Sequence, residues 1–397
     1  MVRPYEGAED FMNPTFCPNP KCVHHHDDKR SDMSSSFWIR FGSYLTKVAG
    51  PVPRFRCIHC GRTFSERTFS VDYYTKRTLD NPEAFRAISA GESVSSIARN
   101  LRCSVASVQN RLERLGRNAA ALQACLTEDL VLTEDLAADG FESFDRSQFF
   151  PNNINLLVGS SSQFLYAATH ASLRRKGRMT VSQKRRRDRY DLSFRPAPKS
   201  LQRSCERLFG TIPALWDRSS RPFLALTTDE HRAYPLALSK IAALAVAGAE
   251  GAFVHRRCPS TEARTTWNPL FPVNYYDREL RKDLAAFRRE STCYTRNVAA
   301  GLLRFANHLA WHNYCKPHRI VSTAEKPPVH AVVAGIDGRR IQAALERMFR
   351  DRSFLSKARL SDEWIDIWLK RHLTPLKEGP EYVPAYARCG LQQGSEN

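Results

Sequence analysis

Hydrophobic positions follow two different patterns along the chain. Between residues 81 and 123 the apolar residues recur at intervals of three and four, which predicts a helical segment. Between residues 130 and 254 they form short continuous runs bounded by turn residues, which is typical of buried strands. We therefore expect a helical subdomain followed by a unit built around a β-sheet.

The second region contains five strand candidates, at 136–139, 154–158, 164–169, 223–227 and 252–255. Helical patterns at 201–208 and 234–249 separate the later strands, so the expected fold is α/β with a mixed sheet. Further helical patterns follow at 274–309, 341–349 and 362–372.

The first seventy residues show neither pattern but carry two closely spaced cysteine pairs. Cys17 and Cys22 form the first pair, Cys57 and Cys60 the second, and strand-like pieces lie at 37–41 and 54–56. Two pairs on tight turns can place four thiolates about 2.3 Å from one Zn²⁺. We expect a structural zinc with no open position for catalysis. Four unrelated cysteines are the alternative, and nearby histidines are possible substitute ligands: His24, His25, His26 and His59.

Residues 93–116 read as two helices joined by a short turn at 102–104, the pattern of a helix-turn-helix. The second helix is expected to present polar residues outward to base edges and phosphates of the DNA major groove. These residues are Gln109, Asn110, Arg111 and Arg114. A helical hairpin that only packs against the rest of the chain would show a similar pattern.

Charge favours the nucleic-acid interpretation. The 397 residues include 60 Lys and Arg against 41 Asp and Glu, a formal charge of +19, which suits a polyanionic partner. No apolar run is long enough for a membrane span, and the N-terminus lacks a signal-peptide pattern. Eleven scattered cysteines do not resemble a secreted disulfide framework. We expect a cytoplasmic protein with no membrane partner.

A dense basic run lies between two strand candidates. It includes Arg174, Arg175, Lys176, Lys184, Arg185, Arg186 and Arg187. This density favours a loop that contacts phosphates, although a solvated surface is the alternative.

Two aspartates follow apolar runs. Asp139 comes after the run that begins at Leu136, and Asp229 comes after the run that begins at Phe223. We expect both at strand ends. Two such acids and a third from a later helix can bind a pair of divalent ions that activate water or a 3′-hydroxyl. A single strand-end aspartate is more often a turn former.

In combination, these segments resemble bacterial insertion-sequence transposases of the RNase H-like DDE superfamily, in the group with an N-terminal zinc ribbon and helix-turn-helix. The likeness spans roughly residues 15–315 and rests on CIHCGRTFSERTF, SIARNLRCSVASVQNRL, DGFESF, TTDEHRAY and LRKDLAAFRRESTCYTRNV. It implies an RNase H-like fold, catalytic Mg²⁺ or Mn²⁺, and cleavage and joining of double-stranded DNA at element ends.

The resemblance further implies a homo-oligomer on DNA in the nucleoid. Asp139 and Asp229 would be the first two metal ligands, accompanied by His231 and Tyr234.

The third metal ligand is where the chain departs from the family. Asn274 stands where the family has glutamate, with Arg281 in the basic position two turns later. Asp277 lies one helical turn after Asn274 and could reach the same metals, whereas Glu279 points about 140° away. Alternatively, Asn274 caps a helix with Asp277 as its third residue.

Two functions therefore remain open. One is a transposase using Asp139, Asp229 and Asp277 as its catalytic residues. The other is a catalytically degraded, transposase-derived DNA-binding protein or regulator that acts by occupying its site.

The expected organisation has four parts. A zinc ribbon (1–70) and a helix-turn-helix domain (71–125) precede an RNase H-like domain (126–315) with a mixed five-stranded sheet and a basic insertion (173–190). A mainly helical extension (316–397) follows, and the sequence assigns it no role.

Overall fold

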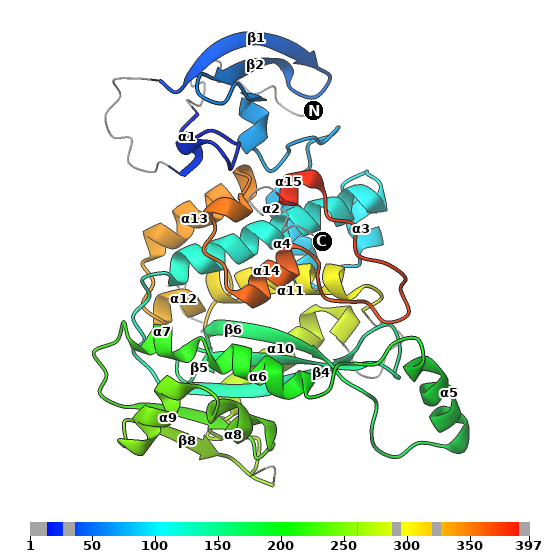
Figure 1. Cartoon of the computed structure of the whole chain (residues 1–397), viewed down its shortest axis with the longest axis vertical. Coiled ribbons are helices and arrows are strands. Elements are labelled where there is room, and N and C mark those ends of the chain that lie inside the picture. Colours follow the sequence, from blue (N-terminus) through cyan, green and yellow to red (C-terminus); the bar gives the residue numbers. More distant parts are fainter. Residues whose placement is uncertain (1–13, 27–35, 260, 288–294, 320–326, 389–397) are drawn as a thin grey trace.

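The computed structural model describes residues 14–26, 36–259, 261–287, 295–319 and 327–388. In Figure 1 a small sheet lies at one end, a layer of helices lies in the middle and a larger sheet lies below it. Helix α5 (Val181–Asp191) stands away from the rest at the lower right of the same view.

The small sheet is an antiparallel ribbon of three strands. Their order is β1 (Trp38–Thr46), β2 (Gly50–Cys57) and β3 (Thr63–Ser65). Its core is small and consists mainly of cysteines and phenylalanines, one of which, Phe354, comes from the C-terminal part of the chain. The two expected strand pieces are confirmed as parts of β1 and β2.

The larger sheet has five strands: β4 (Leu136–Phe144), β5 (Pro151–Gly159), β6 (Leu165–Ser172), β7 (Leu224–Thr228) and β8 (Phe253–Arg257). Their order is β6-β5-β4-β7-β8. β4, β5 and β6 pair antiparallel, whereas β7 and β8 run parallel to β4. Each strand overlaps one of the expected apolar runs, so the mixed five-stranded sheet is confirmed.

Helices cover this sheet. β5 and β6 are buried along nearly their whole length, which means that both of their faces are covered. Helix α6 (Ser200–Phe209) packs on β5 and β6, and α10 (Phe271–Asp283) packs on β4 and β5. The sheet and these helices form the largest hydrophobic core among the described residues.

Helix α4 (Val105–Thr127) extends from the helix pair into that core. Its first turns pack on α2 (Asn81–Ser89) and α3 (Val94–Asn100), and it also packs on α11 (Val298–Tyr314) and α13 (Gly338–Arg350). At Gly116 a Cβ would lie 2.4 Å from the Leu303 carbonyl oxygen, so glycine permits the close approach of α4 and α11. The expected boundary at residue 125 falls inside α4, and the division into domains stays a prediction.

The C-terminal part is built onto α4. The Asn118 side chain donates hydrogen bonds to the backbone carbonyls of Met348 and Asp351, at 2.7 and 2.8 Å. Arg117 donates to the carbonyl of Trp368, at 3.0 Å, at the end of α14 (Asp362–Trp368). The short helices α12 (His330–Val333) and α15 (Ala385–Arg388) complete this part. The C-terminal part of the chain is therefore attached to the helical layer through α4.

Three expected segments differ in detail. The pattern at 234–249 forms two helices, α8 (Ala233–Leu238) and α9 (Ala242–Ala249), and the one from residue 274 forms α10 and α11. The basic run, expected as a loop, contains α5. Within the described ranges, no helix combines the length and apolar character that crossing a membrane requires.

Candidate functional site

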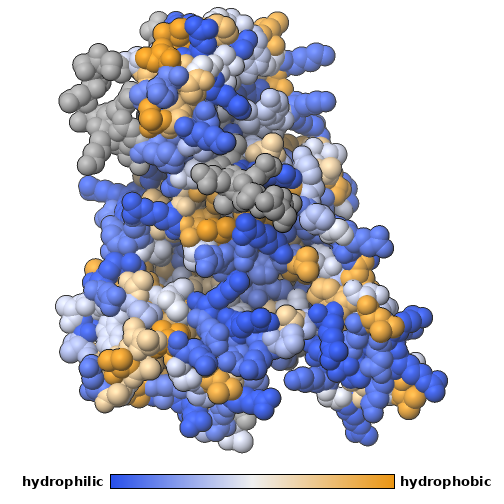
Figure 2. Space-filling view, in the orientation of Figure 1, coloured by the Kyte–Doolittle hydropathy of each residue, from blue (hydrophilic) through white to orange (hydrophobic). Residues whose placement is uncertain are grey.

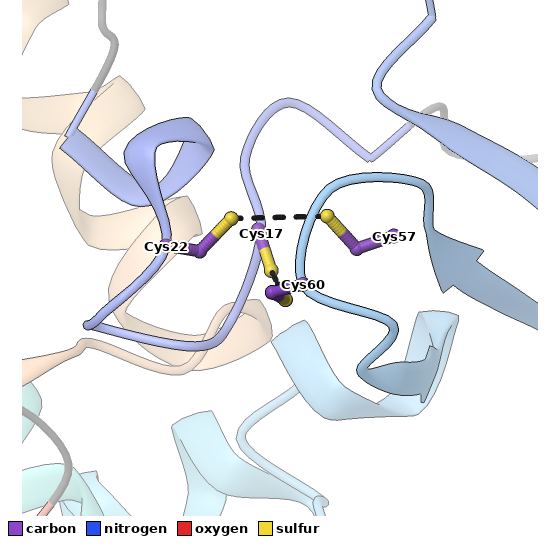
Figure 3. Close-up of side chains that lie close together, drawn as sticks. All are labelled: Cys17, Cys22, Cys57 and Cys60. Carbon is purple, nitrogen blue, oxygen red and sulfur yellow. Dashed lines mark hydrogen bonds between the residues drawn. The ribbon is translucent and has the colours of Figure 1, made fainter.

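The four N-terminal cysteines converge on one point (Figure 3). Their sulfur atoms all lie within 4.8 Å of one another, with Cys17 Sγ 3.6 Å from Cys60 Sγ and Cys22 Sγ 3.8 Å from Cys57 Sγ. Sulfurs placed tetrahedrally 2.3 Å from a zinc ion lie about 3.8 Å apart. The cluster could therefore hold a structural metal such as zinc.

The thiols of the cluster differ in their surroundings. Burial raises the pKa of Cys17 and of Cys22. Burial acts to raise the pKa of Cys60, but hydrogen bonds from Asn19 and the Arg62 backbone and its neighbouring thiols lower it to about 7. The His25 ring is engaged elsewhere, 2.7 Å from both the Cys17 carbonyl oxygen and the Ser356 hydroxyl. That second contact ties the cluster to the C-terminal part of the chain.

Asp139 and Asp229 come together across the junction of β4 and β7. The parallel register pairs Leu136 with Leu226 and Ala137 with Thr227. Extending it by two residues places Asp139 beside Asp229, just beyond the end of β7. Asp229 is thus at a strand end as expected, whereas Asp139 is not, because β4 continues to Phe144 along β5.

Asp139 is strongly influenced by its environment. Its Oδ1 accepts hydrogen bonds from the Gly140 backbone N–H, at 2.7 Å, and from the Tyr234 hydroxyl, at 3.3 Å. Burial, together with the nearby charge of Asp229, raises the pKa of Asp139 to about 6 despite these bonds and the opposing charge of Arg264. A bound cation would relieve the repulsion between the two carboxylates.

The neighbouring residues fix this geometry. The Asn153 side chain packs over Gly140, in the space that a Cβ at this position would occupy, directly beside Asp139. Asp229 Oδ1 accepts the His231 backbone N–H at 2.8 Å, which orders the turn that leads to Tyr234. Tyr234 is 4% exposed, and burial first, then Asp139 and Asp229, raise its pKa well above the ordinary value. It therefore remains a hydroxyl donor to Asp139.

Asp277 is not part of a three-carboxylate cluster. Among the described residues, the four cysteines alone form a group of three or more ligand side chains within 4.8 Å of one another. Helix α10 also begins at Phe271, with Leu270 at its N-cap, so Asn274 lies inside the helix and does not cap it. The capping alternative for Asn274 and Asp277 is wrong, because the helix has already begun at Phe271, with Pro272 in its first turn.

Two other residues of α10 have structural contacts. Arg281 lies with its guanidinium carbon 4.5 Å from the centre of the Phe141 ring and donates to the Glu142 carbonyl oxygen at 3.3 Å. Glu279 is 4% exposed and forms an ion pair with Lys316. Glu279 is therefore a buried carboxylate paired with a cation.

The second helix of the helix pair presents only part of the predicted surface. Gln109 and Asn110 are exposed, but Arg111 and Arg114 are buried. Arg111 pairs with the carboxylate of Asp72, and Arg114 donates to two backbone carbonyl oxygens at 2.8 and 2.9 Å. The prediction that both arginines face outward is wrong, because the segment before α2 and the C-terminal part cover that side of α4.

The basic segment around α5 is highly accessible. α5 contains no buried residue, and Figure 2 shows this segment as a largely hydrophilic projection at the lower right. Two of the residues predicted to contact phosphates have acidic partners: Arg174 pairs with Asp191 at 2.8 Å, and Arg187 pairs with Asp188 at 2.7 Å. Arg175 lies over the Phe149 ring. The remaining predicted cations are exposed: Lys176, Lys184, Arg185 and Arg186.

Two residues near the carboxylates carried no signal in the sequence. Arg264, in the connection between β8 and α10, acts on Asp139, and Cys205 of α6 is close enough to Asp229 for that charge to contribute to its raised pKa, after burial and Glu206. Both residues lie near the carboxylates because segments distant in sequence pack together. Local sequence patterns do not indicate such packing.

The raised pKa of Asp139 predicts an unusual dependence of stability on pH. Because the native state keeps this proton longer than the unfolded chain, metal-free stability should fall as pH rises from about 4 to 6. We expect Asp139→Asn to raise the free energy of unfolding at pH 7 by up to about 3 kcal/mol, with little change at pH 4. Urea unfolding at both pH values in chelator measures this.

Asp129 offers a control, because its pKa is shifted in the opposite direction: a hydrogen bond with Arg340 lowers it. Asp129→Asn should not stabilise the protein at pH 7. Equal effects of the two substitutions would show that the Asp139 carboxyl is not destabilised by its site.

No protein-family model matches this chain, and no curated protein is significantly similar to it in sequence.

Proposed function

We propose that this protein is a DNA-binding transposase-type enzyme that cleaves and joins DNA strands with divalent metal ions. The observation that carries the proposal is that Asp229 lies close enough to Asp139, near the β4–β7 junction, for its charge to join burial in raising the pKa of Asp139 to about 6. A buried carboxyl group with a second carboxylate nearby is suited to a divalent cation.

The remainder of the chain supports this function. A mixed five-stranded sheet with helices is the architecture implied by an RNase H-like domain. The four-cysteine cluster fits structural Zn²⁺. Helices α3 and α4 follow one another across a short turn, with Gln109 and Asn110 exposed on α4, and we propose that this pair is a helix-turn-helix. The charge of +19 suits double-stranded DNA.

In this proposal each residue near the carboxylates has a distinct role. Asp139 and Asp229 would hold Mg²⁺ or Mn²⁺, and such an ion activates water or a 3′-hydroxyl and stabilises the leaving oxygen. Tyr234 donates a hydrogen bond to Asp139 and so fixes the orientation of that carboxylate. The test is metal-dependent nicking of DNA by the wild type and its loss in Asp139→Asn.

A second function is favoured by one specific observation. Asn274 replaces the glutamate expected from the resemblance, and Asp277 does not complete a cluster with Asp139 and Asp229. A catalytically degraded protein that binds DNA and acts by occupancy would have this arrangement. It would bind DNA but show no metal-dependent cleavage.

DNA binding by the α5 segment predicts a specific salt effect. Replacing Lys184, Arg185 and Arg186 together by Ala should reduce the slope of log affinity against log salt by about 2.7, since each lost phosphate contact contributes about 0.9 on duplex DNA. The helix should persist because alanine favours it. Anisotropy titrations at several salt concentrations measure the slope.

Arg339 provides the control for this experiment. It is an exposed cation on α13, and Arg339→Ala should leave the slope nearly unchanged. An unaltered slope in the triple variant would mean that the α5 segment does not contact phosphates.

A further inference from the structure

Two adjoining hollows lie where the ribbon meets the helical layer. The first has a volume of about 800 Å³ and lies between the β1–β2 hairpin and the segment 73–76. The second, of about 470 Å³, is bounded by the same tyrosines, Tyr73 and Tyr74, and by α4 and the C-terminal part. The two hollows share five lining residues, Thr63, Phe64, Thr68, Tyr73 and Tyr74, and the pair is here called the ribbon groove.

The ribbon groove is lined by basic residues and by no acidic ones. Its lining includes seven Lys and Arg residues, among them Lys47, Arg54 and Lys76, and no Asp or Glu. At the ratio of acidic to basic residues in the whole chain, about five acids would accompany seven bases. This excess of positive charge makes the groove complementary to a polyanion.

Aromatic rings lie among these cations. The Tyr74 ring is 83% exposed, Tyr44 is 39% exposed, and Tyr73 lies 4.5 Å from Tyr74 between ring centres. Exposing a large aromatic ring to water is unfavourable, and a ligand that covers the ring removes this cost. Exposed rings in a cationic groove therefore indicate a ligand with flat apolar faces. Figure 2 shows hydrophobic and hydrophilic residues interspersed over the ribbon end of the molecule.

Internal contacts hold the wall of the groove in place. Arg67 donates hydrogen bonds to the backbone carbonyls of Asp72 and Thr75, at 3.2 and 3.3 Å. Arg352 lies over the Tyr73 ring, with its guanidinium carbon 4.7 Å from the ring centre. A wall that is already ordered loses little conformational entropy when a ligand binds.

We propose that the ribbon groove binds single-stranded DNA, with phosphates on Lys47, Arg54 and Lys76 and unpaired bases stacked on Tyr44 and Tyr74. Bases offer their faces for stacking only when they are unpaired, and a cationic groove with exposed rings is the usual device for holding such a strand. The inference rests on the proposed function, since an enzyme that cuts the two strands of a duplex at staggered positions leaves unpaired bases at the ends. Asn110 of α4 lines the second hollow, so the strand would continue toward the helix pair.

Binding of fluorescein-labelled (dT)20 to the full, zinc-loaded chain tests this proposal. Tyr74→Ala should weaken binding at least about fivefold, which corresponds to the lower end of base-stacking contributions. Tyr74→Phe should bind within about twofold of the wild type, because it keeps the ring. Lys47→Ala with Lys76→Ala should reduce the salt slope by about 1.4, whereas Arg339→Ala should not change it.

Other outcomes would overturn the inference. Unchanged (dT)20 binding by Tyr74→Ala and by the lysine pair would show that the ribbon groove is not used. If the variants lose as much affinity for a 20-base-pair duplex as for (dT)20, the groove binds duplex DNA. If the protein binds U20 tightly but does not bind (dT)20, the groove binds RNA.

The proposed function can fail separately. Absence of metal-dependent cleavage together with Tyr74-dependent binding of (dT)20 would remove the enzyme proposal and leave the ribbon groove. Metal-dependent cleavage together with (dT)20 binding that Tyr74→Ala does not weaken would remove the ribbon groove proposal and leave the enzyme proposal.

Discussion

Replacing Asp139 or Asp229 by Asn is expected to abolish metal-dependent nicking of DNA, by on the order of 10³-fold or more, with little change in DNA affinity. Each substitution removes one charge from the pair at the β4–β7 junction while keeping the size of the side chain. The exposed cations of α5 and the polar residues of α4 are untouched, so binding should persist. Nicking of supercoiled plasmid in Mg²⁺ or Mn²⁺ measures the first effect, and anisotropy measures the second.

Glu142 supplies a matched control, because it is an exposed carboxylate on the same strand as Asp139. Glu142→Gln should nick DNA as fast as the wild type. If Asp139→Asn also keeps wild-type nicking, the carboxylate pair is not the catalytic centre.

The same assay separates the two candidate functions. If the binding of metal and DNA moves the Asp277 carboxylate into position as a third metal ligand, Asp277→Asn should abolish nicking. If the wild type does not nick DNA, and Asn274→Glu fails to restore nicking, the protein acts by occupancy.

Removal of the N-terminal metal is the second large effect that we expect. One zinc per chain should be released by a strong chelator or by Cys22→Ser, and residues 36–69 should then lose protection from proteolysis and hydrogen exchange. Among the residues that the structure describes, the hydrophobic core of the ribbon consists of eight buried residues, three of which are cysteines. Zinc binding to small modules of this kind supplies about 10–16 kcal/mol, which the remaining apolar contacts cannot replace.

Cys125→Ser is the control for this experiment, since Cys125 is exposed and lies outside the cluster. It should retain the zinc and the protection of the ribbon. A metal-free protein whose ribbon stays protected would contradict a structural role for the metal.

Features that depend on neighbouring residues could be predicted from the sequence. The five strands correspond to short apolar runs, and the cysteine spacing placed four thiols on two turns that the structure brings together. Asp139 and Asp229 could be singled out because each follows an apolar run. The continuation of β4 past Asp139 to Phe144 could not be expected, because no apolar run follows Asp139.

Features that depend on distant segments could not be predicted. Arg111 and Arg114 have the spacing of an exposed helical face, yet Asp72 and the backbone near it bury them. The start of α10 at Phe271 decides between a cap and an interior position for Asn274, and the proline there is compatible with both. The ribbon groove combines residues from β1 to the C-terminal part, and no local pattern connects them.

We propose that Asp139 and Asp229 form a divalent-metal centre, and Mn²⁺ binding is the measurement that detects such a centre. Electron paramagnetic resonance of free Mn²⁺ should show uptake by the zinc-loaded wild type in the presence of DNA, and Asp139→Asn and Asp229→Asn should each remove that uptake. Glu142→Gln should take up Mn²⁺ as the wild type does. Uptake that is the same in all four proteins, or absent from the wild type, would contradict the claim.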